Sequence, residues 1–172
     1  MPPDGMEIDT TSELPRQIPA CAVRLLARLA WFTDPDIVSR VRLKKAGWFA
    51  RLLSSPRFVA TDIAAIVLGH TIYFRQPNFF DPHTPRGLAF LAHEIKHIEQ
   101  VEKTGLVAFY WRYWCDYRKY GYGEKIPIET EAYQLQRTVH AHLRHEFAQN
   151  NGHMPCIEMA APHTPNLDFS IF

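Results

Sequence analysis

Two histidines four residues apart, with a glutamate directly after the first, constrain the fold of this chain more than any other feature. Residues 93–97 read His-Glu-Ile-Lys-His. In an α-helix each residue turns the side-chain direction by about 100°, so His93 and His97 project from nearly the same face. Both imidazoles can then bind one metal ion, while Glu94 points aside and can hydrogen-bond a water at that ion. The run therefore predicts a helix that carries two metal ligands and a general base.

The flanking residues predict where this helix begins and ends. Thr84 can cap free amides with its side chain, and Pro85 suits the first helical turn. Gly105 suits a stop just past the last turn, so the helix should span about five turns. Its apolar stripe consists of Leu88, Leu91, Ile95 and Ile98.

The other faces of this helix differ in character. His93, His97 and Gln100 share one face, and this face is expected to carry the site. Lys96 and Glu99 are expected on a solvated face. The arrangement predicts an amphipathic helix with one side against the core and the histidines beside it.

A catalytic zinc usually takes three protein ligands, and the third is expected downstream. Pro127 suits the entry to a second helix, which places Glu129 in the first turn. Glu131 is the alternative, but it points about 200° away around the helix, so only one of the two can face the metal. We favour Glu129. Acidic residues at this position can also simply complement the helix dipole.

A small β-sheet or hairpin is predicted before the histidine-bearing helix. Residues 66–68 and 71–74 are β-prone, and Gly69-His70 between them suits a tight turn. Farther upstream, Asp34-Pro35-Asp36 signals a helix start, and residues 20–55 are expected to form helices packed beside the site. Together these elements predict an α+β fold that is predominantly helical.

The stretch 57–133 resembles minimal gluzincin-type metallopeptidase domains and is similar to the eCIS core domain, an HExxH domain of proteins linked to extracellular contractile injection systems and polymorphic toxins. The matching residues are 65–74, 81–87 and 91–100. The segment 129–132 also resembles the membrane CAAX protease group, in which its first glutamate is the third zinc ligand. Tyr133 stands where those proteases carry aspartate, which leaves the outer support of a ligand histidine unassigned.

The resemblance implies a zincin-like zinc metallopeptidase with a peptide or protein substrate. His93, His97 and Glu129 would bind Zn²⁺, and Glu94 would act as general base toward a metal-activated water. A strand edge beside the cleft would bind an extended peptide. The alternative is a non-catalytic zinc-binding module that acts with a toxin or secretion-system partner. The donor to the oxyanion stays open among Tyr113, Tyr117, Tyr120, Tyr133 and His70.

The aromatic stretch 109–120 contains interleaved basic residues, a pattern that nucleic-acid stacking or a membrane-interface helix could also produce. We favour an amphipathic helix that closes the core, with Arg112 and Lys119 in solvent. Its core side would comprise Phe109, Trp111, Tyr113, Tyr117 and Tyr120. A net charge of +1 with dispersed basic residues argues against a nucleic-acid partner.

Length and composition fit one domain. The chain has 172 residues, 47% of them hydrophobic, and we expect a tail at 1–19, a single zincin-like metallopeptidase domain at 20–154 and an irregular segment at 155–172. No apolar run reaches the roughly 18 residues of a membrane span. No signal peptide is recognised, and the three cysteines have no short spacing and are expected to be reduced or buried thiols. Both features favour a cytoplasmic protein. Export by a specialised system is compatible with this, and the sequence does not indicate an oligomeric state.

Overall fold

The computed structural model describes residues 17–28, 32–47, 64–75, 81–121 and 123–150. The expected N-terminal tail lies outside this part except for residues 17–19, and the segment 155–172 lies wholly outside it. Ile18 is buried, and Gln17 forms a β-bridge with Arg42. The folded domain therefore includes the residues just before the first helix.

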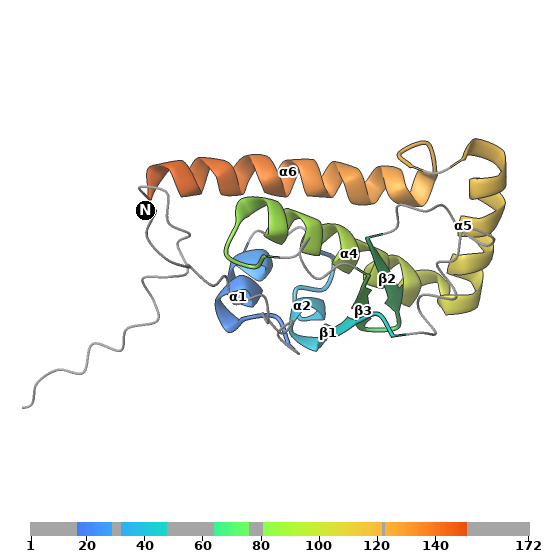
Figure 1. Ribbon diagram of the computed structural model, residues 1–172, viewed down its shortest axis with the longest axis horizontal. Helices are drawn as coiled ribbons and strands as arrows, with labels where there is room; N and C mark the ends of the chain where they lie inside the picture. Colours follow the sequence, from blue (N-terminus) through green and yellow to red (C-terminus); the bar gives the residue numbers. More distant parts are fainter. Residues whose placement is uncertain (1–16, 29–31, 48–63, 76–80, 122, 151–172) are drawn as a thin grey trace, which may run out of the picture.

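The predicted α+β fold with mostly helical content is confirmed (Figure 1). The helices are α1 (Ala20–Arg28), α2 (Ile37–Arg40), α4 (Pro85–Thr104), α5 (Leu106–Tyr120) and α6 (Pro127–Gln149). The strands are β1 (Arg42–Lys45), β2 (Ala65–Leu68) and β3 (Thr71–Phe74). None of the helices in the described ranges combines the length and hydrophobicity that a bilayer crossing needs.

The predicted hairpin is confirmed as β2 and β3, which pair antiparallel around Gly69 and His70. Gly69 has a φ of 58°, a backbone conformation that costs glycine little. The sheet order is β1-β3-β2. The expectation of helices throughout residues 20–55 is wrong at β1, because α2 ends at Arg40 and β1 pairs parallel with β3. Residues 48–55 of that stretch lie outside the described part of the chain.

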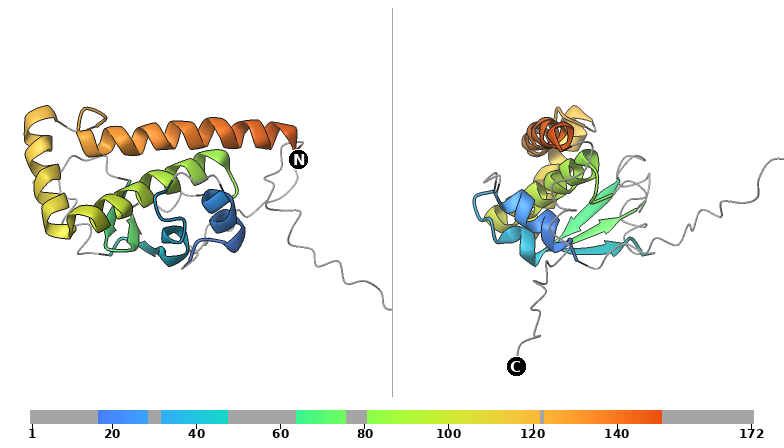
Figure 2. Two further views of the ribbon diagram at one scale, coloured as in Figure 1. Left: turned by 180° about the vertical axis from the view of Figure 1, so that it is seen from behind. Right: turned by 90° about the vertical axis from the view of Figure 1, so that its left-hand side faces the viewer.

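The histidine-bearing helix α4 has the predicted limits. Thr84 accepts a hydrogen bond from the amide of Gly87 at 3.1 Å, and Gly105 follows the last turn with a φ of 82°. Figures 1 and 2 show α4 in the middle of the molecule, with the sheet on one side and α6 running alongside on the other. The predicted apolar stripe of α4 is fully buried. This central position fixes the direction in which the histidine face points.

Helix α5 forms as predicted but packs against the rest of the protein on one side only. It lies across one end of the molecule, between the end of α4 and the start of α6 (Figure 1). Phe109 is its one buried residue among those described, whereas Trp111 and Tyr120, which we expected in the core, are 65% and 40% exposed. A helix at the end of the molecule meets neighbours on one side only, so three of its seven aromatic residues are left at the surface.

Candidate metal centre

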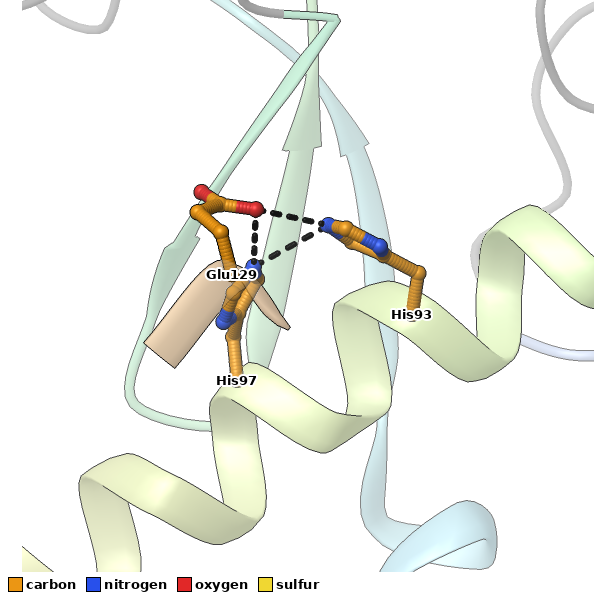
Figure 3. A group of neighbouring side chains, drawn as sticks. All are labelled: His93, His97 and Glu129. Carbon is orange, nitrogen blue, oxygen red and sulfur yellow. Dashed lines mark hydrogen bonds and ion pairs between the residues drawn. The ribbon is translucent and has the colours of Figure 1, made fainter. Parts of the chain in front are cut away.

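The side chains of His93 and His97 on α4 and Glu129 on α6 converge on one point (Figure 3). The Nε2 atoms of the two histidines lie 3.1 Å apart. Glu129 Oε2 lies 3.3 Å from His93 Nε2 and 3.6 Å from His97 Nε2. All three residues are at least nine-tenths buried. Two neighbouring turns of α4 and the first turn of α6 thus build one enclosed group of donors.

These separations fit a bound metal ion. Around a tetrahedral zinc, with zinc–ligand distances of about 2.0–2.1 Å, neighbouring ligand atoms lie about 3.3 Å apart. The three observed separations fall close to that value. Two imidazole nitrogens and one carboxylate oxygen are donors that suit zinc, and three ligands leave a fourth position open. The donor set therefore matches a metal site of the catalytic type.

Glu129 has the protonation state that a ligand needs. Burial alone would raise the pKa of this carboxyl, but hydrogen bonds from His93 and His97 lower its pKa to about 2. The carboxylate is therefore ionised at neutral pH, which is the form that binds metal. Burial alone would lower the pKa of His97, but its hydrogen bond to Glu129 raises it. Without an ion, the two groups satisfy each other.

Glu131, the alternative ligand, points away from the group. Its side chain is 61% exposed, and its Oε2 accepts a hydrogen bond from Gln100 Nε2 at 3.1 Å. Lys96 Nζ lies 3.9 Å from the same oxygen. The two-residue offset on α6 thus sends Glu129 inward and Glu131 outward, as helical geometry predicts.

Gln100 sets the orientation of the His97 ring. Its amide nitrogen donates to Ile128 O and Glu131 Oε2, both at 3.1 Å. Because the amide protons are used there, Oε1 accepts from His97 Nδ1, 2.9 Å away. That hydrogen bond holds a proton on Nδ1, so Nε2 is the nitrogen that faces Glu129 and His93 and that would lose its proton when a metal binds. Gln100 lies on the face predicted from the sequence and also joins α4 to α6.

His93 lacks a comparable support. Its Nδ1 is buried and has no hydrogen-bond partner among the described residues. The edge of the Tyr133 ring meets the imidazole, with ring centroids 4.7 Å apart, and Phe90 stacks at 6.4 Å. Aromatic packing therefore orients the His93 ring. Among the described residues no carboxylate hydrogen-bonds its Nδ1, and Tyr133 packs against the ring instead.

Glu94 is buried beside the three donors. Desolvation raises the pKa of this carboxyl, the nearby histidines oppose the rise, and the charge of Glu129 adds to it. A carboxylate whose pKa is raised accepts a proton more readily than an ordinary one. Glu94 is thus buried close to the three donors, as its place next to His93 in the sequence predicted.

The candidate oxyanion donors are distributed over the molecule. Tyr133 lies at the site, where burial and the charge of Glu129 raise the pKa of its phenol. His70 is at the hairpin turn, 2.7 Å from Glu102. Tyr113 and Tyr117 pack on the cluster around Phe109, and Tyr120 is exposed. Of these five candidates, only Tyr133 contacts one of the three donors in the described contacts.

Tyr110 is a residue that the sequence reasoning missed. Its hydroxyl donates to the carbonyl oxygen of Val67 on β2. Burial, and next the charge of Glu94, raise the pKa of this phenol, which places it near the Glu94 carboxyl. The sequence offered no signal beyond membership of the aromatic stretch, because the contact joins α5 to a strand 43 residues earlier.

Val67 lies on β2, which is an edge strand of the sheet formed by the described residues. Arg75 N donates to Ala64 O at 2.9 Å, and hydrogen-bonded pairs alternate along an antiparallel ladder. With Val67 opposite Ile72, its main-chain groups therefore point away from β3, toward Tyr110. The edge strand β2 thus passes close to the candidate site.

Two of the three cysteines lie in the described part of the chain. Cys21 forms a disulfide, so the expectation of a reduced or buried thiol is wrong for this residue. Cys115 is a free thiol, exposed on α5. Neither contributes to the group formed by His93, His97 and Glu129.

Comparison with known proteins gives one match, to the family model of the eCIS core domain over residues 26–105. This chain is similar to that family in the part that contains the sheet and α4. The matched part, less than half of the chain, includes His93, Glu94 and His97 and ends before α5 and α6, so Glu129 lies beyond it. No match was found among curated proteins or among solved structures.

Proposed function

We propose that this chain is a zinc-dependent peptidase of the gluzincin type. The observation that carries the proposal is the convergence of His93, His97 and Glu129 in one buried group beside the carboxylate of Glu94. A metal site that served only to hold α4 and α6 together would not require a buried acid next to its ligands, since burial of such an acid costs free energy. We therefore assign His93, His97 and Glu129 as ligands and Glu94 as general base.

In the proposed reaction, a zinc ion and the side chains of the protein would have different roles. When bound, a zinc ion would supply Lewis-acid activation of water and of the substrate carbonyl. Glu94 takes a proton from the attacking water, holds it at its carboxylate and delivers it to the leaving amine. Its raised pKa makes this carboxylate a stronger base toward the water. Gln100 keeps His97 in the tautomer that leaves Nε2 available.

The substrate in this proposal is an extended peptide. Ala65 and Val67 direct their main-chain groups to the outer edge of β2, where a peptide can add as a further strand. Tyr110 hydrogen-bonds the carbonyl of Val67, so this hydroxyl must be displaced before a peptide pairs along the whole edge. Tyr133 lies against His93 and is the residue we assign as donor to the oxyanion.

The decisive experiment is zinc-loaded Glu94→Gln protein assayed against a broad peptide library. We expect one zinc per chain, an unchanged melting temperature and a loss of cleavage of about 10²–10⁴-fold, the usual contribution of a general base. Glu102→Gln, on the same helix but at the surface, is the matched control and should cleave as the wild type does. Cleavage retained by Glu94→Gln would refute the assigned base.

A second candidate function is a non-catalytic zinc-binding module that works with a secretion-system or toxin partner. The match of residues 26–105 to the eCIS core domain supports it. This candidate predicts that zinc-loaded wild type cleaves no peptide in the library. It also predicts that the protein binds its partner equally well as Glu94→Gln, while a variant that cannot hold zinc, His97→Ala, binds it less well.

A further inference from the structure

Helix α5 exposes one continuous face, which we call the outer face of α5. Val107 is 84% exposed, Trp111 65% and Trp114 42%. Residues at these positions recur at three- and four-residue steps, so they share one side of the helix. The outer face comprises Val107, Ala108, Trp111, Arg112, Trp114, Cys115, Arg118 and Lys119, all of which are exposed.

The charge on this face has one sign. Arg112, Arg118 and Lys119 are basic, and the face contains no acidic residue. Asp116, the acidic residue of α5, is half-buried on the side toward the body of the protein, 3.8 Å from Arg112 Nε. The guanidinium of Arg118 lies 5.1 Å from the centre of the Trp114 ring, and the Trp111 and Trp114 rings are 5.4 Å apart. Tryptophan rings and cationic groups therefore lie side by side on the outer face of α5.

The shape of the molecule leaves this face accessible to a flat surface. Helices α4 and α6 run away from α5 along the long axis, so α5 closes one end of the molecule (Figure 1). The view from behind in Figure 2 shows the same arrangement. Gly105 and Gly121, both with positive φ, bound α5 and permit the sharp changes of direction at its ends. A planar partner can thus approach the outer face without meeting α4 or α6.

We propose that the outer face of α5 docks the protein onto an anionic lipid bilayer, with α5 lying in the plane of the membrane surface. Tryptophan rings favour the headgroup level of a bilayer, where their apolar body and polar N–H are both accommodated. Arginine and lysine beside them meet the negative headgroups. A nucleic-acid partner fits less well, because phosphate backbone binding calls for a wider basic patch than three groups, whereas a bilayer interface also accommodates the rings of Trp111 and Trp114.

The test is flotation of the full chain with vesicles of phosphatidylcholine alone or with about 30% phosphatidylserine. We expect binding to the phosphatidylserine vesicles, weakened by salt, and little binding to phosphatidylcholine. The double variant Trp111→Ala, Trp114→Ala should lose binding. The double variant Arg118→Gln, Lys119→Gln should bind roughly 30-fold more weakly, since each basic group near an anionic surface contributes about fivefold.

The matched control is Arg24→Gln, Arg144→Gln, which removes the same charge from exposed positions on α1 and α6 and should bind like the wild type. All substituted residues are exposed, so circular dichroism should show the folded protein in every variant. The proposal is overturned if the wild type does not float with anionic vesicles, or if the control loses as much binding as the α5 charge variant. It is also overturned if the tryptophan variant floats as the wild type does. In that case, a change from dimer to monomer in this variant would show that the tryptophans form an interface between two copies of the chain.

Discussion

Gln100 Oε1 accepts a hydrogen bond from His97 Nδ1 at 2.9 Å, and this contact determines which ring nitrogen faces the other two donors. The same amide reaches across to Ile128 O on α6. One side chain therefore sets both the histidine tautomer and the position of the helix that carries Glu129. Two of the three proposed ligands depend on it.

Removal of this amide should weaken metal binding. In Gln100→Ala the imidazole of His97 loses its Nδ1 partner, and we expect zinc affinity to fall by about 10–100-fold, as is usual for a group that orients a ligand. Competition with a chromophoric chelator measures the change. Gln134→Ala, at an exposed position on α6, is the control and should bind as tightly as the wild type. Equal affinities for the two variants would contradict the assigned role of Gln100.

Substitutions of Glu129 and Glu131, near the start of α6, should differ sharply in their effect on zinc affinity. Glu129→Gln removes a buried ionised ligand, and we expect a loss of zinc affinity of at least about 100-fold. Glu131→Gln changes an exposed side chain that only contacts Gln100 and Lys96, so affinity should change by less than about tenfold. Isothermal titration calorimetry of metal-free protein with zinc measures the affinity of each variant. The reverse ranking would make Glu131 the ligand.

Local patterns in the sequence were enough to predict α4 and its histidine face. Thr84, Pro85 and Gly105 act within one turn of the helix ends, and the spacing of His93 and His97 follows from helical periodicity alone. Glu129 was also predictable, because Pro127 fixed the phase of α6 relative to its start. These features need no knowledge of distant contacts.

Features that depend on distant contacts were not predictable. Strand β1 forms because β3 supplies hydrogen-bond partners about thirty residues later in the chain, as in the bond from Arg42 N to His70 O. Helical periodicity groups Trp111 with its neighbours but does not say which side of α5 meets the protein. Glu99, expected in solvent, is 3% exposed because it accepts a hydrogen bond at 2.7 Å from the amide of Thr33.

The buried environment of Glu99 predicts a specific response to acid. Burial favours the neutral form, but hydrogen bonds from Lys96 and Thr33 lower the pKa of this carboxyl to about 2 from an ordinary 4.5. A lowered pKa in the folded state contributes stability that is fully present above pH 4.5 and is lost as the pH falls toward 2. We therefore expect the free energy of unfolding of metal-free protein to fall more steeply across this window in the wild type than in Glu99→Gln. Parallel slopes in urea titrations at several pH values would contradict this.

The contact between Tyr110 and Val67 should contribute to stability independently of any metal. Tyr110→Phe removes a partly buried hydroxyl that donates to a main-chain carbonyl, and we expect the free energy of unfolding to fall by about 1 kcal/mol. Tyr117→Phe, on the same face of α5, is the matched control and should change it by less than about 0.5 kcal/mol. Urea denaturation with metal-free protein measures both. Equal effects would show that the hydroxyl of Tyr110 has no special role.

Metal removal should loosen the packing of α4 against α6, because the proposed ligands come from both helices. A ligand that binds only the folded state stabilises it by about 2.7 kcal/mol when its free concentration is 100 times the Kd. For a domain of this size that corresponds to a rise in Tm of roughly 5–11 °C, which a chelator should reverse. Scanning calorimetry with and without chelator should show this difference in the wild type and in Glu102→Gln, but not in Glu129→Gln. A shift of equal size in Glu129→Gln would mean that the stabilising ion binds elsewhere, because that variant lacks the ligand through which α6 is joined to the two histidines of α4.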